Sequence, residues 1–81
     1  MTLTVLLFAA ARDLVGTDRV TIEAPTGVTV RDMRRILAER QPALATLLAR
    51  CRIAVNQEFA AEDTVVTVVD EIAVIPPVSG G

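Results

Sequence analysis

The alternation of apolar and polar residues at the start of the chain constrains its fold most strongly. Residues 2–9, TLTVLLFA, begin with an apolar side chain at every second position, and residues 19–24, RVTIEA, repeat the pattern. A period of two is typical of strands with one buried face. Between them, residues 10–15 fit a short helical turn that Gly16 stops. We therefore expect two paired strands, whose buried residues are Leu3, Val5, Leu7, Val20 and Ile22.

A helical pattern follows the turn that Pro and Gly predict at 24–27. Thr29 and Asp32 form a T-x-x-D start, in which the threonine hydroxyl accepts a backbone N–H that has no partner within the helix. The apolar residues at helical spacing are Val30, Met33, Ile36 and Leu37. The side expected to face solvent carries Arg31, Arg34, Arg35 and Glu39. Gln41-Pro42 ends this helix, and the leucines within 44–48 indicate a further short one.

The last third of the chain returns to strand patterns. We expect strands at 52–56 (RIAVN), 64–68 (TVVTV) and 71–76 (EIAVIP). The resulting order predicts an α+β protein in which a mixed sheet packs on one main helix. A β-grasp, or ubiquitin-like, arrangement matches this order best. The predicted division is a β-grasp domain over 1–76 and a flexible Gly-Gly tail over 77–81.

The composition excludes several kinds of chemistry. The chain contains no histidine, no lysine and one cysteine, Cys51. A Ser-His-Asp site, a His-ligated metal, a Schiff base and a four-cysteine cluster therefore have no residues to form them, and we expect no metal site. The net charge is −2 with no basic run, which argues against a nucleic-acid partner. The apolar stretch at 5–11 is too short for a membrane span, so we expect a cytoplasmic protein with no membrane partner.

Three groups of polar or reactive residues each have a structural reading. Asp70 and Glu71 are neighbours on an expected strand and would point to opposite faces, so a polar turn before the last strand is the favoured interpretation. Cys51 has an arginine on each side, which could lower the pKa of its thiol, yet a small buried cysteine is the commoner case. The cationic helix face described above is most simply a solvated one.

Two further features remain open on the residues alone. Phe8 falls on the same strand face as threonines, and Ile75 alternates with Val74, so an exposed apolar contact surface and a face covered by a helix are both possible. At the end of the chain, Pro76 and Pro77 favour an extended conformation. From Pro76 the chain could reach about 20 Å at roughly 3.3 Å per residue. Two final glycines, Gly80 and Gly81, would fit a narrow channel because they have no Cβ.

A β-grasp order that ends in Gly-Gly resembles the ubiquitin-like sulfur carriers, and most specifically the small-subunit family of molybdopterin synthase. The matching segments cover most of the chain: VLLFAAARDLVGTD at 5–18, AVNQ at 54–57 and DEIAVIPPVSGG at 70–81. One departure is Val69, which stands where the family usually has a glycine. Because a turn with positive φ would strain valine, we expect a reshaped turn there.

The resemblance implies a chemical role for the C-terminus. A ubiquitin-activating-type enzyme would consume ATP to adenylate the Gly81 carboxylate, and a sulfur donor protein would convert it to a thiocarboxylate. The large synthase subunit would accept the tail, and the sulfur would pass to the cyclic pyranopterin precursor to build the dithiolene. The family forms a heterotetramer and binds no stable cofactor in this subunit. The residues implied in partner binding are Phe8, Phe59, Ile75, Pro76, Pro77, Val78 and Ser79, with Gly80 beside the reactive Gly81.

Three alternatives stay open. A carrier of the thiamine-pathway type would share the thiocarboxylate and use another acceptor enzyme. A ubiquitin-like protein modifier would join its terminal carboxylate to lysines of other proteins. An inert interaction domain would not use the tail at all.

Overall fold

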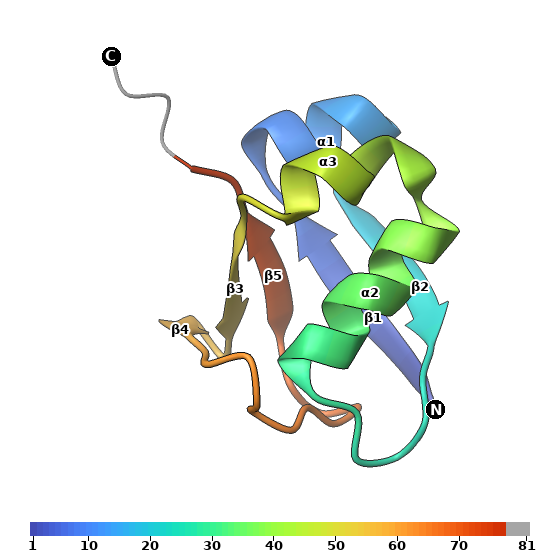
Figure 1. The fold of residues 1–81 in the computed structure, drawn as a ribbon, viewed down its shortest axis with the longest axis vertical. Coiled ribbons are helices and arrows are strands. Elements are labelled where there is room, and N and C mark those ends of the chain that lie inside the picture. Colours follow the sequence, from blue (N-terminus) through green and yellow to red (C-terminus); the bar gives the residue numbers. More distant parts are fainter. Residues whose placement is uncertain (78–81) are drawn as a thin grey trace.

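Five strands form one mixed sheet, and the helices pack against one of its faces (Figure 1). The computed structural model describes residues 1–77. In chain order the elements are β1 (Thr2–Leu7), α1 (Ala9–Val15), β2 (Arg19–Glu23), α2 (Val30–Arg40), the 3-10 helix η1 (Pro42–Leu44), α3 (Ala45–Leu48), β3 (Arg52–Val55), β4 (Glu58–Phe59) and β5 (Ile72–Ile75). The predicted α+β fold, with a mixed sheet packed on one main helix, is confirmed. The domain and tail boundary stays a prediction, since 78–81 lie outside the described residues.

The strand order is β2-β1-β5-β3-β4, which places the last strand in the middle of the sheet. β1 pairs antiparallel with β2 and parallel with β5, and β3 pairs antiparallel with both β5 and β4. The parallel pair joins the two ends of the chain, so most of the sequence lies between two neighbouring strands. This topology, with one main helix across the sheet, is the predicted β-grasp arrangement.

The core lies between the sheet and α2. The expected inward residues of the first two strands are all buried, as are Val30, Met33 and Leu37 on the helix. Ile36 is only partly buried and packs at the edge of the core. Since the opposite faces of β1 and β2 carry mostly exposed polar residues, the sheet buries one face under the helices and leaves the other open.

The start of α2 is stabilised by its own cap and by a distant segment. The Thr29 hydroxyl accepts a hydrogen bond from the Asp32 N–H at 3.2 Å, as the sequence predicts. The N–H groups of Val30 and Arg31 donate to the carbonyls of Thr64 and Glu62, each at 2.9 Å. Three N–H groups of the first turn, which have no partner within the helix, are therefore satisfied.

The predicted strand at 64–68 is wrong. The segment makes one isolated bridge, between Val65 and Thr29, and its backbone is used to cap α2. Only Val66 of this stretch is fully buried, whereas Val65 and Val68 are exposed. The valines and threonines had strand character, but the hydrogen bonds go to a helix end instead of a neighbouring strand.

The fourth strand is instead β4, which follows β3 through a tight turn. Asn56 and Gln57 at the turn both have positive φ, at 54° and 70°. Positive φ at both central residues is the type I′ geometry that suits the twist of a two-residue hairpin. The turn lacks the glycine that usually reveals it, which explains why the sequence pattern did not predict this hairpin.

Arg34 is the other correction. It was expected on the solvent side of α2, but its side chain is only 20% exposed and forms an ion pair with Glu62 at 2.8 Å. Its Nη1 also donates to the carbonyl oxygens of Leu48 and Cys51. Arg31 and Arg35 are exposed, as expected.

In residues 1–77, no helix combines the length and the apolar character that crossing a membrane requires.

Candidate functional site

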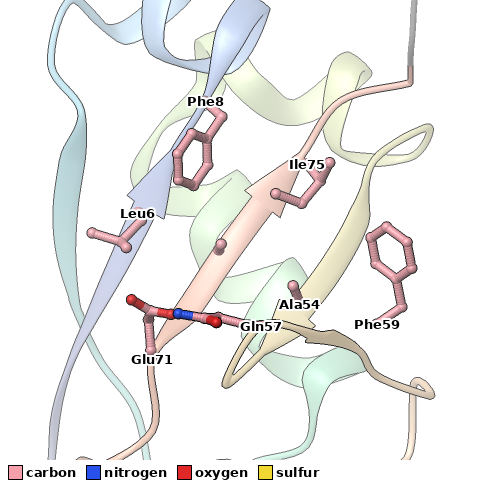
Figure 2. Close-up of a pocket in the computed structure, with 8 residues that line it drawn as sticks. Leu6, Phe8, Ala54, Gln57, Phe59, Glu71 and Ile75 are labelled. Carbon is pink, nitrogen blue, oxygen red and sulfur yellow. The ribbon is translucent and has the colours of Figure 1, made fainter.

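The open face of the sheet carries a hollow of about 350 Å³. Figure 2 shows it on the strands β1, β5 and β3, on the side away from α2. Its lining residues are Leu6, Phe8, Ala54, Gln57, Phe59, Glu71, Ala73 and Ile75. Most of this lining is apolar, so the open face is suited to contact with another protein or a small apolar group.

Strand register explains why the surface is hollow at this point. Ala73 of β5 pairs with Leu6 on one side and with Ala54 on the other, and Ala54 pairs with Phe59. These residues form one row across four strands on the same face of the sheet. Two methyl groups in the middle of the row give a low floor between larger side chains at its ends.

Three of the residues implied in partner binding line this one hollow. Phe8 follows β1 and precedes the first turn of α1, Ile75 ends β5, and Phe59 ends β4. Figure 2 shows both rings beside the floor, one near the end of β1 and the other on the β4 side. Phe8 is 45% exposed and Phe59 is 54% exposed. The alternative left open for Phe8, that a helix covers it, therefore does not hold within residues 1–77. The role of these residues in docking stays a prediction.

Phe59, which forms one side of the hollow, makes a cation–π contact. The Arg52 guanidinium lies 3.7 Å from the centroid of the Phe59 ring. A cation over an aromatic face is attracted by the ring quadrupole, typically by about 0.5–1 kcal/mol at an exposed site. This contact holds the ring of a short edge strand in place beside the hollow.

The hollow is polar at the end where β5 begins, which is opposite to the end that carries Phe8 and Ile75. Gln57 and Glu71 lie there (Figure 2). The backbone of Glu71 is held by Asn56, whose Oδ1 accepts from the Glu71 N–H at 2.9 Å and whose N–H donates to the Glu71 carbonyl at 2.7 Å. The β3–β4 turn and the start of β5 are thus held together by one asparagine.

Asp70 belongs to the same arrangement, and its carboxylate is used for structure. It accepts hydrogen bonds from Asn56 Nδ2 at 3.0 Å and from the Thr67 N–H at 2.8 Å. These donors, the Asn56 amide first, hold the pKa of Asp70 below its usual value. The interpretation of Asp70 and Glu71 as a polar turn is therefore supported. Val69 lies in this turn and is exposed, without the positive φ that would strain it.

Cys51 is 5% exposed and packs in the core. Burial raises the pKa of its thiol, and this effect exceeds the opposing effect of the Arg34 and Arg50 charges. A raised pKa disfavours the nucleophilic thiolate, which supports the structural reading. Within residues 1–77, no three His, Cys, Asp or Glu side chains gather as a group able to hold a metal ion.

The hollow is continuous with the end of the described chain. β5 forms part of the floor, and directly after Ile75 the chain continues into Pro76 and Pro77. The predicted site residues Val78, Ser79, Gly80 and Gly81 lie outside the described residues. A partner seated in the hollow would therefore contact the domain next to the point where the tail begins.

A mixed sheet in this order, with the C-terminal strand at its centre and an open apolar face, defines a β-grasp protein of the ubiquitin-like class. More particularly, the chain belongs to the ThiS family, whose profile matches residues 5–81. Two curated relatives are called molybdopterin synthase sulfur carrier subunit. The Arabidopsis thaliana protein is 38% identical over 95% of this chain and 80% of its own length. The Escherichia coli protein is 40% identical over 95% of this chain and 96% of its own length. The predicted resemblance to this family is confirmed.

Solved structures agree with the fold. Small archaeal modifier protein 1 from Haloferax volcanii superposes with a TM-score of 0.86 at 28% identity, and both chains are covered completely. A putative molybdopterin converting factor subunit 1 from Pyrococcus furiosus superposes with a TM-score of 0.82 at 30% identity, over 96% of this chain and 99% of that one. A Helicobacter pylori chain superposes with a TM-score of 0.70 at 27% identity, and both chains are covered completely. That structure is a complex of subunits 1 and 2 of molybdopterin-converting factor.

The sequence predicted three of the eight residues that line the hollow. It named the large apolar residues on the rim but not the two alanines of the floor, nor Leu6, Gln57 and Glu71 as lining residues. An available signal was the small residue at the centre of two neighbouring strands, in RIAV and IAVI. Their alignment depends on the register between β3 and β5, which no local pattern gives.

Proposed function

We propose that this chain is the sulfur-carrier subunit of a molybdopterin synthase and that the hollow on the open face of its sheet docks the large subunit. The observation that carries the proposal is the continuity of the aromatic-rimmed hollow with β5, the strand that leads into the Gly-Gly tail. The names of the curated relatives and the subunit complex of the Helicobacter pylori neighbour support the same assignment.

The proposed chemistry takes place at the Gly81 carboxylate. A ubiquitin-activating-type enzyme uses ATP to form an acyl adenylate and releases pyrophosphate. A sulfur donor protein then supplies a sulfide equivalent, which attacks the acyl carbon as AMP leaves, and a thiocarboxylate results. When the sulfur passes to the cyclic pyranopterin precursor, the acyl group must recover an oxygen, so the carboxylate is regenerated at the cost of water. The chain has no histidine to act as a general base, so we assign the acid–base groups to its partners.

The geometry supports separate roles for the domain and for its tail. An apolar hollow gains affinity by removing its lining from water, at about 25 cal/mol for each Å² buried. That contact places the start of the tail next to the partner, and it converts the reaction of the terminal group into an intramolecular one. The domain therefore supplies position, and the tail supplies the reacting atom.

The test is the intact mass of the full chain after incubation with ATP, an adenylating partner and a sulfur source. We expect a gain that corresponds to one oxygen replaced by sulfur. A variant without Gly81, treated identically, is the matched control and should not change. No gain in the parent chain, with an adenylating partner verified on another carrier, would refute the sulfur-transfer proposal.

A protein modifier is the second candidate, because the Haloferax volcanii and Methanosarcina acetivorans structural neighbours are described as small archaeal modifier proteins. A modifier would share the adenylate and differ in the acceptor, which would be a lysine amine on another protein. Isolation of lysine conjugates that carry this chain through Gly81 would support it. A thiamine-type carrier would form the thiocarboxylate but would not restore molybdopterin synthesis with the large subunit.

A further inference from the structure

The two ends of the hollow differ in chemistry: the end next to the start of the tail is apolar, and the end remote from it is acidic. Phe8 and Ile75 lie at the end where β5 leaves the sheet, whereas Glu71 lies at the end where β5 begins. Four residues along a strand separate Glu71 from Ile75, which corresponds to about 13 Å. A partner that fills the hollow thus meets an apolar end beside the tail and an acidic end remote from it.

The Glu71 carboxylate is not used within the described part of the chain. Its residue is held through the backbone, by the two hydrogen bonds with Asn56. The ion pairs within residues 1–77 engage other carboxylates, and none includes Glu71. Arg52, a cation on β3, pairs across the strands with Ile75 at the other end of the hollow and lies on the ring of Phe59. The carboxylate is therefore available for a cation from outside.

We propose that the large subunit presents an apolar side chain to the floor of the hollow and a basic side chain to Glu71, so that Glu71 sets the orientation in which the carrier docks. The inference rests on the proposed function and specifies the chemistry of the partner surface. An apolar contact alone is tolerant of rotation, because burial of apolar area has no direction. A charge at one end removes that freedom, since complementary charges set register and suppress wrong arrangements.

The net charge of this chain, −2, favours the same kind of partner, because a basic surface is drawn to it before contact. A second copy of this chain fits less well. Docked face to face, it would bring another Glu71 and an arginine that is already engaged with Phe59. We therefore commit to a partner with a basic side chain beside an apolar one, and we treat self-association as an outcome of the test.

The test compares Glu71→Gln and Glu71→Arg with the parent chain, using the large synthase subunit from the same organism as the binding partner. Association rate and Kd are measured at low and at high salt. Glu58→Gln is the matched control, because Glu58 is an exposed carboxylate on β4 whose neighbour Phe59, and not itself, lines the hollow. Glu71 contributes to the turn through its backbone N–H and carbonyl, not through its carboxylate. The thermal unfolding midpoint of both Glu71 variants should therefore match that of the parent.

We expect Glu71→Gln to weaken binding about two- to fivefold at low salt, mainly through the association rate, and the difference to shrink at high salt. Glu71→Arg should weaken it by at least about tenfold, because like charges are placed opposite each other. Glu58→Gln should leave both constants unchanged. Equal effects of the two glutamine variants, or tighter binding by Glu71→Arg, would overturn the inference.

Phe59→Ala separates this inference from the proposed function. It should weaken binding at both salt concentrations, because the lost contact is apolar. If Phe59→Ala weakens binding and Glu71→Gln does not, the docking face stands and the role of Glu71 is refuted. If neither changes binding, the docking face itself is wrong. A concentration-dependent dimer of the isolated chain that Phe59→Ala abolishes would assign the hollow to a second copy and also overturn the inference.

Discussion

Arg34 and Glu62 are 28 residues apart in the chain and form a two-point ion pair. Arg34 Nε donates to Glu62 Oε1 at 3.1 Å and Nη2 donates to Oε2 at 2.8 Å. The remaining nitrogen of the guanidinium, Nη1, donates to the carbonyls of Leu48 and Cys51. One side chain on α2 therefore joins the helix to the segment that caps it and to the end of α3.

Arg34→Lys should lower the free energy of unfolding by about 1–3 kcal/mol, because an ammonium cannot reproduce the planar fork and leaves backbone carbonyls without a donor. Urea unfolding measures this difference. Arg35→Lys is the control, since Arg35 is 62% exposed and, among residues 1–77, pairs only with residues of its own helix. That change should stay within about 0.5 kcal/mol. Equal losses in the two variants would show that the fork of Arg34 does not stabilise the fold.

The pH dependence of stability should change in Glu62→Gln. The hydrogen bond from Arg34 is the main cause that lowers the folded-state pKa of Glu62 below its ordinary value of 4.5. Because the unfolded carboxylate takes up its proton at higher pH than the folded one, the contribution is present above pH 4.5 and is lost as the pH falls through the folded pKa. The parent should therefore lose more stability on acidification than the variant.

Urea midpoints measured from neutral pH down to below pH 4 would test this expectation, on either side of the ordinary Glu62 pKa of 4.5. Glu58→Gln removes one exposed carboxylate that lies outside this ion pair, and it serves as the control for the loss of a negative charge. Asp70, whose pKa is also lowered, keeps its own contribution in every variant. Parallel profiles for parent and Glu62→Gln would contradict the role of the ion pair.

Within the segment that caps α2, burial predicts opposite outcomes for two similar residues. Val66 has no exposed surface, and Val68 is 60% exposed. Val66→Ala should cost roughly 2 kcal/mol, because it removes buried methyl groups and leaves a cavity. Val68→Ala should lie within about 0.5 kcal/mol of the parent. A similar cost at both positions in urea unfolding would contradict the assigned inward and outward sides.

Gln57→Gly should stabilise the protein by up to about 1 kcal/mol. Gln57 holds a φ of 70°, a left-handed conformation that costs residues with a Cβ and costs glycine little. Gln57→Ala is the matched control, since it removes the same side chain but keeps the strained backbone. It should show no gain in thermal or urea unfolding. A gain in both variants would assign the effect to the side chain instead of the turn.

How far the sequence predicts this fold depends on how local each signal is. The alternation around Leu3 and Val5 and the cap at Thr29 are local, and both are found as expected. The valine-rich segment near Val66 carries the same pattern as a strand, yet its hydrogen bonds go to the start of α2. Arg34 has a solvent-side spacing on its helix, but its partner is a distant glutamate.

The candidate site divides in the same way. Phe8 could be predicted as a contact residue from its strand face, which it shares with threonines, whereas Phe59 was implied only by the family resemblance. The floor of the hollow could not be predicted, because Ala54 and Ala73 acquire meaning only when the strand register places them side by side. The position of Glu71 at one end of the hollow depends on its hydrogen bonds with Asn56 in the β3–β4 turn. The sequence did not predict that turn, because it contains no glycine.

The place of β5 in the sheet has a mechanical consequence. The strand is bonded on both sides, to β1 and to β3, and the chain leaves it directly at Pro76. A pull applied to the C-terminal end, along the strand, would load the hydrogen bonds of both its edges at once, in shear, instead of opening them one after another. A domain built in this way can be held by its end in another protein while its sheet resists being drawn apart.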